Sequence, residues 1–325
     1  MVRIAQWASS ENYGRWGSPG DQRKDPNYKT ANVYEGEADI VEFQPAKWER
    51  IFRLIDQGKA ELLANKAEAA VRNPHNGYAW DSSNTEHSFY RALKAAGWDP
   101  AAITTDNNAN CSSGVAALLC SVGIPVDPDM WTGTALQILT ATGEVLVLDD
   151  SCFVSSSRYM RRGDILHRTG KDGAAGHMAI VIDNGEYAVP LPMITTGRSW
   201  QRMSCSKLSQ GLRVIEEGKA IAALLPELGG RWHLTIYNNR MGWESRAWFR
   251  PLRYFIVSAY RCNLRRDPGL AGQVQKTLSN GDILPATGRE YVDARGVIWY
   301  QVASGSVLGW ISELMGDLVT ERSEE

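Results

Sequence analysis

This chain of 325 residues has no apolar run of the roughly 20 residues that a membrane-spanning helix needs. Its first ten residues, MVRIAQWASS, lack the apolar core and the cleavage-site context of a secretion signal. The five histidines show no HExxH or similar spacing, and the five cysteines include no CxxC pair. These absences predict a soluble chain without a signal peptide that binds no metal, needs no cofactor and does not insert into a membrane.

Composition is that of an ordinary globular protein, with 43% hydrophobic and 22% charged residues. The length predicts two or three folded units. The formal net charge is only −2, yet basic residues far outnumber acidic ones between Arg198 and Arg266. Such a stretch fits a solvated surface or attraction to an anionic polymer, and the absence of a recognition motif argues against nucleic acid.

One cysteine and one histidine stand in a context typical of thiol chemistry. Cys111 follows Asn110 and opens an apolar, helix-like run, whereas His177 opens an apolar strand after a Gly-rich loop. A thiol is a good nucleophile as thiolate, and a helix N-terminus with an adjacent imidazolium lowers its pKa. Although Cys111 alone would suit a buried structural thiol, its polar, Ser-rich setting and His177 favour catalysis. The other four cysteines and four histidines are interpreted as structural or solvated.

The order of elements predicts an α+β fold. Helices are expected over residues 45–72, 83–97 and 111–123, and strands over 163–167 and 177–183 then pair antiparallel. This arrangement places a cysteine on a helix against a histidine on a sheet.

Residues 10–189 resemble the NlpC-type cysteine peptidases, the papain-like bacterial cell-wall hydrolases, and more closely their versions in bacteriophage endolysins. Five short motifs carry the resemblance: GDQ at 20–22, GY at 77–78, NCSS at 110–113, RGDIL at 162–166 and GHMAIV at 176–181. The resemblance implies a papain-like α+β catalytic domain over residues 1–193, with Cys111 as nucleophile and His177 as general base.

Two further roles follow from the same resemblance. Tyr78 is expected near the thiol as a polar wall or oxyanion contact, while Asp21 and Gln22 form either a turn or a substrate contact. The family usually has Asp where this chain has Asn110, which can still cap the helix.

The resemblance leaves the residue that orients the imidazole open. In the family it lies on the strand after the histidine strand, but residues 187–192 of this chain offer no obvious polar partner. Asp183, Asn184 and Glu186, near the expected hairpin turn, are the remaining candidates.

A second module is expected over residues 251–325, whose opening resembles a bacterial SH3-like cell-wall-binding domain. Short strands separated by turn residues independently fit a small all-β barrel. Tyr260 and Trp299 are candidates for a ligand groove, although in so small a barrel Trp299 more often belongs to the core. The basic, Trp-rich region 194–250 remains unassigned, with a helix expected over 211–225 and a strand over 232–237.

Together these features predict a peptidoglycan hydrolase of the endolysin type, held in the host cytoplasm until its release and then bound to the bacterial cell wall. Cleavage inside the stem peptide, as an endopeptidase, is favoured over an N-acetylmuramoyl-L-alanine amidase activity. An anionic wall polymer is a further candidate partner. The alternative from another class is a non-catalytic wall-binding protein.

Overall fold

The computed structural model describes residues 1–8, 38–45, 48–78, 88–170 and 175–320. The chain divides into two compact units, Met1–Glu186 (unit 1) and Tyr187–Glu325 (unit 2). Of the described residues, 42% lie in strands and 21% in helices. The expectation of an α+β papain-like domain followed by one small SH3-like barrel is therefore wrong. Antiparallel sheet dominates, and three large sheets take the place of one sheet and one barrel.

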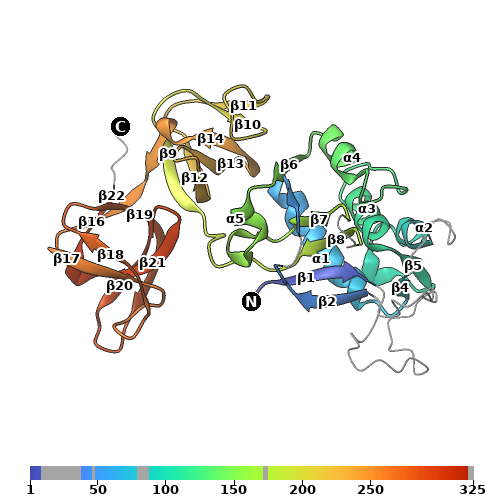
Figure 1. The fold of residues 1–325 in the computed structure, drawn as a ribbon, viewed down its shortest axis with the longest axis horizontal. Helices are drawn as coiled ribbons and strands as arrows, with labels where there is room; N and C mark the ends of the chain where they lie inside the picture. The colour runs from blue at the N-terminus through green and yellow to red at the C-terminus, as the bar shows by residue number, and fades with distance from the viewer. Residues whose placement is uncertain (9–37, 46–47, 79–87, 171–174, 321–325) are drawn as a thin grey trace. The chain divides into compact units, whose positions relative to one another are not determined.

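Unit 1 is built on a six-stranded antiparallel sheet (Figure 1). Its strands are β1 (Arg3–Trp7), β2 (Ala38–Glu42), β3 (Arg50–Leu54), β6 (Val145–Leu148), β7 (Ile165–Arg168) and β8 (His177–Val181). They are ordered β2-β1-β8-β7-β3-β6. The predicted antiparallel pairing of the RGDIL and GHMAIV segments is observed between β7 and β8. Among the described residues, β1, β2 and β3 precede the first helix, so the expected order of helices before strands is not observed.

Strand β3 lies where the sequence predicts the start of a helix. Its residues from Ile51 onward are buried on both faces of the sheet, and a strand buried on both faces lacks the alternation that identifies a strand. Arg53 within it donates from Nε and Nη2 to the carboxylate of Asp164 at 2.7 and 2.6 Å, and both side chains are almost fully buried. Asp164 of the RGDIL motif is thus part of the structural core.

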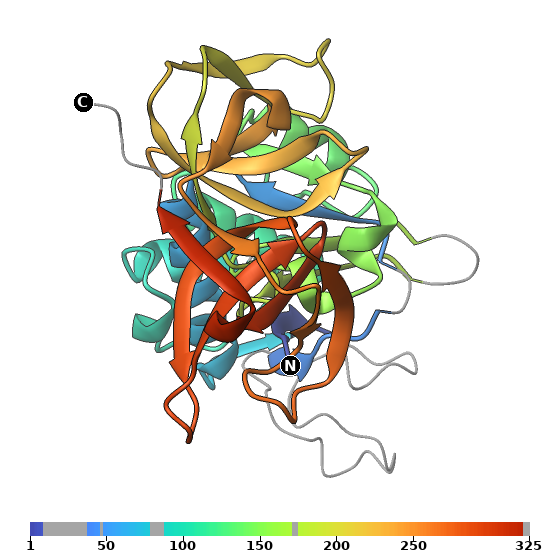
Figure 2. The same ribbon diagram turned by 90° about the vertical axis from the view of Figure 1, so that its left-hand side faces the viewer.

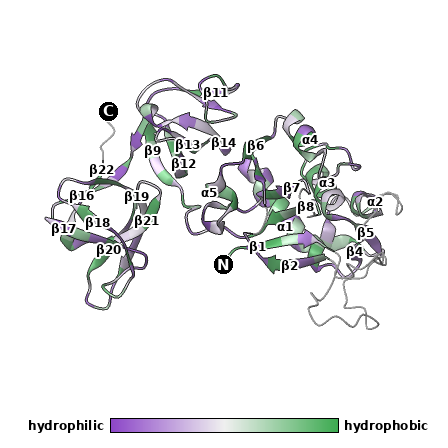
Figure 3. Ribbon diagram, in the orientation of Figure 1, coloured by the Kyte–Doolittle hydropathy of each residue, from purple (hydrophilic) through white to green (hydrophobic). Residues whose placement is uncertain are grey.

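The described helices of unit 1 are α1 (Gln57–Arg72), α2 (Ser88–Ala95), α3 (Cys111–Ser121), α4 (Ala135–Ala141) and α5 (Ser151–Val154), with short 3-10 turns between some of them. Four of these helices pack beside the six-stranded sheet, and α2 packs against α3 (Figure 3). Gly114 allows α3 to pack closely on β1, because a Cβ there would lie 2.8 Å from the Trp7 ring. Within the described ranges, no helix is both long and apolar enough to cross a membrane.

Unit 2 contains two seven-stranded antiparallel sheets (Figure 2). The first, repeat A, has strands β9 (Leu191–Thr195), β10 (Ser199–Arg202), β11 (Gly211–Ile215), β12 (Ala220–Leu228), β13 (Trp232–Tyr237), β14 (Arg240–Ser245) and β15 (Phe249–Pro251). The second, repeat B, has strands β16 (Arg253–Val257), β17 (Arg261–Arg265), β18 (Val274–Ser279), β19 (Ile283–Val292), β20 (Ile298–Ser304), β21 (Val307–Ser312) and β22 (Gly316–Thr320). Their orders, β11-β10-β14-β13-β12-β9-β15 and β18-β17-β21-β20-β19-β16-β22, correspond strand for strand.

Individual contacts confirm that the two sheets repeat one design. Arg202 and Arg265 each follow a register shift, and each lies opposite a tryptophan, Trp243 and Trp310 respectively. Each arginine donates Nη1 to the backbone carbonyl seven residues later, at 2.8 Å in both repeats. The basic region is therefore a folded copy of the sheet that follows it. The helix expected over 211–225 is wrong, since β11 and β12 occupy that segment.

Candidate active site

Cys111 is the first residue of α3, and the turn before it fixes its position. The parallel pair β4 (Asn76–Tyr78) and β5 (Asn107–Ala109) leads directly into the helix. Asn110 caps the helix as expected, since its side-chain oxygen accepts from the backbone N–H groups of Ser112 and Ser113 at 3.1 and 2.8 Å. Ser113 Oγ in turn accepts from the Asn110 backbone N–H at 2.9 Å. This capping box fixes the thiol at the N-terminus of the helix.

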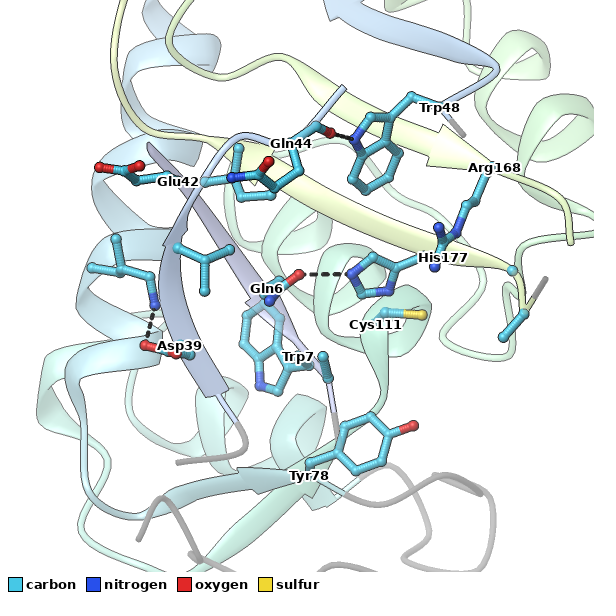
Figure 4. Close-up of a pocket in the computed structure, with 16 residues that line it drawn as sticks. Gln6, Trp7, Asp39, Glu42, Gln44, Trp48, Tyr78, Cys111, Arg168 and His177 are labelled. Carbon is cyan, nitrogen blue, oxygen red and sulfur yellow. Dashed lines mark hydrogen bonds between the residues drawn. The ribbon is translucent and has the colours of Figure 1, made fainter. Parts of the chain in front are cut away.

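His177 is the first residue of β8 and lies opposite Arg168 of β7. Its Nε2 is 2.9 Å from Oε1 of Gln6 on the adjacent strand β1. An amide oxygen only accepts, so this contact keeps the proton on Nε2 and leaves Nδ1 free to accept one. Figure 4 shows the other edge of the ring turned toward Cys111. Gly176 is required before the histidine because a Cβ would lie 2.1 Å from Thr132 Oγ1.

The Trp48 ring holds the imidazole on a second side. The two rings are stacked, with centroids 5.6 Å apart and an interplanar angle of 29°. Trp48 is fixed by its indole N–H, which donates to the Gln44 carbonyl at 3.0 Å. The Arg168 guanidinium lies over the same indole, 5.8 Å from its centroid. Gln6 and Trp48 thus restrict the orientation of the histidine without a carboxylate.

A cavity of about 600 Å³ opens onto this group, with Cys111, His177 and Gln6 in its wall. Such a volume lies within the range typical of small-ligand sites. Tyr78 lines the same cavity from β4, so the structure brings together Cys111, His177 and Tyr78, the three residues expected at the catalytic centre.

Burial shifts both titratable groups toward their neutral forms. Removal from water raises the pKa of the Cys111 thiol above its usual value, and backbone N–H groups and the Arg168 charge only partly oppose this. Burial, assisted by the positive charge of Arg168, lowers the pKa of His177 to about 4. The helix terminus acts in the expected direction, but desolvation outweighs it. The free site therefore contains a thiol and a neutral imidazole rather than an ion pair.

The three candidates for the orienting role lie away from the imidazole. Asp183 accepts from the Arg3 guanidinium at 2.8 and 2.9 Å, beyond the far end of β8. Asn184 accepts from the Arg162 backbone N–H, and Glu186 lies 3.9 Å from Arg158. Gln6 occupies the position that the sequence left open.

The candidate substrate-binding residues lie elsewhere. Asp21 and Gln22 fall outside the described residues. Trp299, in unit 2, is only 2% exposed, and its indole N–H donates to Asp293. It is therefore a core residue and not part of a groove. Tyr260 is 92% exposed on the surface of unit 2.

Sequence reasoning missed three residues of the site, namely Gln6, Trp48 and Arg168. Gln6 lies 171 positions before His177, and only the pairing of β1 with β8 brings them together. Arg168 had a usable signal, because it directly follows the predicted strand that pairs with the histidine strand. As for metals, no group of three or more His, Cys, Asp or Glu side chains is placed to hold an ion in the part of the chain that the structure describes.

Solved structures match parts of this chain. Solved structures that match include NlpC2 from Trichomonas vaginalis (13% identity, 40% of this chain and 49% of that chain, TM-score 0.22). NlpC1 from the same organism matches at 13% identity over 39% of this chain and 45% of that chain (TM-score 0.21). Ly7917 matches at 12% identity over 39% and 63% (TM-score 0.16).

This chain thus spans about half the length of the two NlpC structures, and similarity of this degree does not define a shared activity. No curated protein matches it. Residues 29–188 match the family model of the endolysin-like domain, a stretch that includes both Cys111 and His177.

Proposed function

We propose that this protein is a peptidoglycan hydrolase that cleaves an amide bond of the stem peptide through Cys111 and His177. The observation that carries the proposal is that the thiol and an imidazole held by Gln6 share one cavity. The endolysin-like match over residues 29–188 supports peptidoglycan as the substrate class. Cleavage within the stem peptide is favoured, which makes the protein an endopeptidase.

The neutral state of the site suggests how the reaction starts. As Cys111 Sγ attacks the amide carbonyl, its proton moves to Nδ1 of His177, while Nε2–H stays bonded to Gln6. The carbonyl becomes a tetrahedral oxyanion, which the backbone N–H of Cys111 stabilises, since the N–H groups of Ser112 and Ser113 are already engaged by Asn110. The imidazolium then protonates the leaving amine. Water, deprotonated by the neutral imidazole, hydrolyses the thioester and restores the thiol.

Unit 2 is assigned to wall binding as part of the same proposal. Its repeats A and B carry the basic, Trp-rich stretch between Arg198 and Arg266, and an anionic wall polymer is a candidate ligand. A wall-bound chain would bring the cavity of unit 1 to an insoluble substrate at high local concentration. Neither role requires a cofactor.

The experiment is digestion of purified bacterial cell walls by the parent chain and by Cys111→Ala, with product masses and new termini identified. We expect the substitution to lower release by at least about a thousandfold, since it removes the nucleophile. Cys120→Ala is the matched control, because Cys120 lies on α3 outside the cavity and contacts the Val126 carbonyl. Equal release by Cys111→Ala would overturn the catalytic assignment.

The products also distinguish the two candidate bonds. New amino termini inside the stem peptide support an endopeptidase. Glycan strands released together with intact stem peptides would instead identify an N-acetylmuramoyl-L-alanine amidase. Binding to walls of several chemotypes without any release would favour the non-catalytic wall-binding alternative.

A further inference from the structure

Arg168 is the one cation beside the thiol, among the described residues lining the cavity, and it has no counter-ion there. Its Nε is buried and has no hydrogen-bond partner among the described residues. The carboxylate of Glu49, near in the fold, is already engaged by Thr169 and Arg50. A buried guanidinium nitrogen without an acceptor is costly, so a site that keeps one needs a reason.

The surroundings of Arg168 hold it in place while its charge remains available. Its backbone lies opposite His177 in the β7–β8 pair, and its guanidinium rests over the Trp48 ring. A guanidinium stacked on an aromatic face keeps its edge N–H groups free for a planar acceptor. In Figure 4 this group lies beside His177 on the Cys111 side of the cavity.

Charge across the cavity is arranged asymmetrically. Asp39 and Glu42 line it from β2, whereas Arg168 lies at the opposite side, with Gln6, Cys111 and His177 between them (Figure 4). A substrate carboxylate is repelled by the first side and attracted by the second. The electric field across the cavity therefore orients an anionic substrate in one direction relative to the thiol.

We propose that Arg168 binds a free carboxylate of the substrate that lies next to the scissile amide, and that it selects such substrates over their amidated forms. This inference rests on the proposed function, because it assigns a substrate feature to the same site. A carboxylate accepts two parallel N–H bonds from a guanidinium, whereas a primary amide presents one acceptor and one unpaired donor. Arg168 is thus a specificity-determining residue rather than the nucleophile or base.

The test compares two synthetic stem-type peptides that differ in one group. Both contain a γ-linked D-glutamyl residue on the acyl side of the scissile amide, with its α-carboxyl group either free or amidated. Binding is measured by tryptophan fluorescence to Cys111→Ala, which cannot turn over, and to Cys111→Ala with Arg168→Gln. At pH 7.5 the imidazole of His177 is neutral in both variants, so a change in its pKa does not affect the measured binding ratio.

We expect Cys111→Ala to bind the free carboxylate about 10 to 100 times more tightly than the amide, the range of a charge-assisted hydrogen bond. Arg168→Gln should reduce this ratio to about one, and Arg168→Lys should restore part of it. Arg158→Gln, a change at an arginine 54% exposed and outside the cavity wall, is the control that should leave the ratio unchanged. A ratio that survives Arg168→Gln, or no preference in Cys111→Ala, overturns the inference.

Failure of the proposed function has a different signature. If the parent chain cleaves the amidated peptide in a Cys111-dependent manner but shows no carboxylate preference, the hydrolase assignment holds and the role of Arg168 falls. If a carboxylate preference in binding disappears with Arg168→Gln while no wall digestion depends on Cys111, the binding role holds and the hydrolase assignment falls.

Discussion

Two clusters of enclosed polar side chains, one in each unit, show opposite relations to their surroundings. The active-site cluster of Cys111, His177 and Gln6 faces a cavity. The repeat A cluster is fully enclosed and consists of Ser199, Gln201, Thr235 and Glu244. The first has one exposed side on which a reacting group can be placed. The second has none, which marks it as structural.

Most side-chain hydrogen bonds of the repeat A cluster are made within the cluster. Ser199 donates to Glu244 Oε1, and Thr235 Oγ1 donates to Glu244 Oε2 at 3.1 Å. Gln201 donates to the carbonyl and hydroxyl of Thr235 at 2.9 and 2.8 Å. Among the described residues, Gln201 Oε1 and Arg168 Nε are both buried without a hydrogen-bond partner, but Arg168, unlike Gln201, lines the cavity of unit 1. An unpaired donor beside a cavity is available to a ligand, whereas an acceptor enclosed in repeat A is not.

Repeat B shows that the enclosed polar cluster is dispensable for the architecture. By strand register, the equivalent positions carry four apolar side chains: Cys262, Leu264, Val302 and Ile311. The same strand order forms around either core. The comparison predicts that substitutions in the active-site cluster change activity and leave stability alone, and that substitutions in the repeat A cluster do the reverse.

After loss of the nucleophile itself, the largest effect is expected from Gln6→Leu, which removes the acceptor for His177 Nε2–H. Loss of the fixed tautomer and ring orientation should lower kcat/KM by about 10- to 100-fold, as for other partners of catalytic side chains. Wall digestion measures the change in kcat/KM, and thermal unfolding of the full chain measures the change in stability. An unchanged kcat/KM would contradict this prediction. So would a fall in kcat/KM that is accompanied by a comparable loss of stability.

Gln6→Glu separates a positioning role from mere packing. The carboxylate still accepts from Nε2–H, so much of the activity should return. It also stabilises the imidazolium, so the acid limb of the pH–rate profile should move to higher pH. A variant that regains activity without moving this limb would show that Gln6 acts through packing alone.

A smaller effect is expected from Glu244→Gln in the repeat A cluster. Burial raises the pKa of the Glu244 carboxyl, so the folded state retains its proton after the unfolded chain has lost it. The stability of repeat A should therefore fall as the pH rises above about 4.5, the region where the unfolded carboxyl ionises. Glutamine cannot ionise, so the variant should match the parent at pH 4 and exceed it by about 1 kcal/mol at pH 8.

Hydrogen exchange of strands β13 and β14 in the full chain reports this difference locally. Glu216→Gln, at a side chain that is 62% exposed, is the matched control and should leave the stability of repeat A unchanged at both pH 4 and pH 8. Wall digestion should be the same for all three proteins. A larger stability advantage of Glu244→Gln over the parent at pH 4 than at pH 8 would reverse the sign and contradict the effect of burial on the Glu244 carboxyl.

The sequence predicted what short-range patterns determine. The capped helix beginning at Cys111 could be predicted from Asn110 and the apolar run, and the strand beginning at His177 from its apolar residues after a Gly-rich loop. Two features depended on long-range pairing and could not be predicted. Gln6 reaches the imidazole only through the sheet, and β3 lacked alternation because both its faces are buried.

The duplication of unit 2 escaped for a related reason. The two repeats share a few positions, such as Arg202 with Arg265, but their cores differ in polarity. Ala and Leu in the segment 220–225 favour a helix by intrinsic propensity, and the strand pairing of β12 with β9 and β13 overrides that preference. The strand pairing reveals that repeats A and B are equivalent, although their side chains differ too much for the sequence to show it.

The smallest effect is expected in the pH profile of the parent chain, where it tests whether the active-site cluster holds its histidine neutral. With the pKa of His177 lowered to about 4, the base form is about nine-tenths populated at pH 5. An ordinary histidine of pKa 6.5 would leave only about 3% at that pH. We therefore expect kcat/KM on soluble stem peptides to fall by only about a tenth between pH 7 and pH 5. An acid limb near pH 6.5 would show that the imidazole is solvated or paired with a thiolate, and the cavity would then resemble open solvent rather than the dry interior of repeat A.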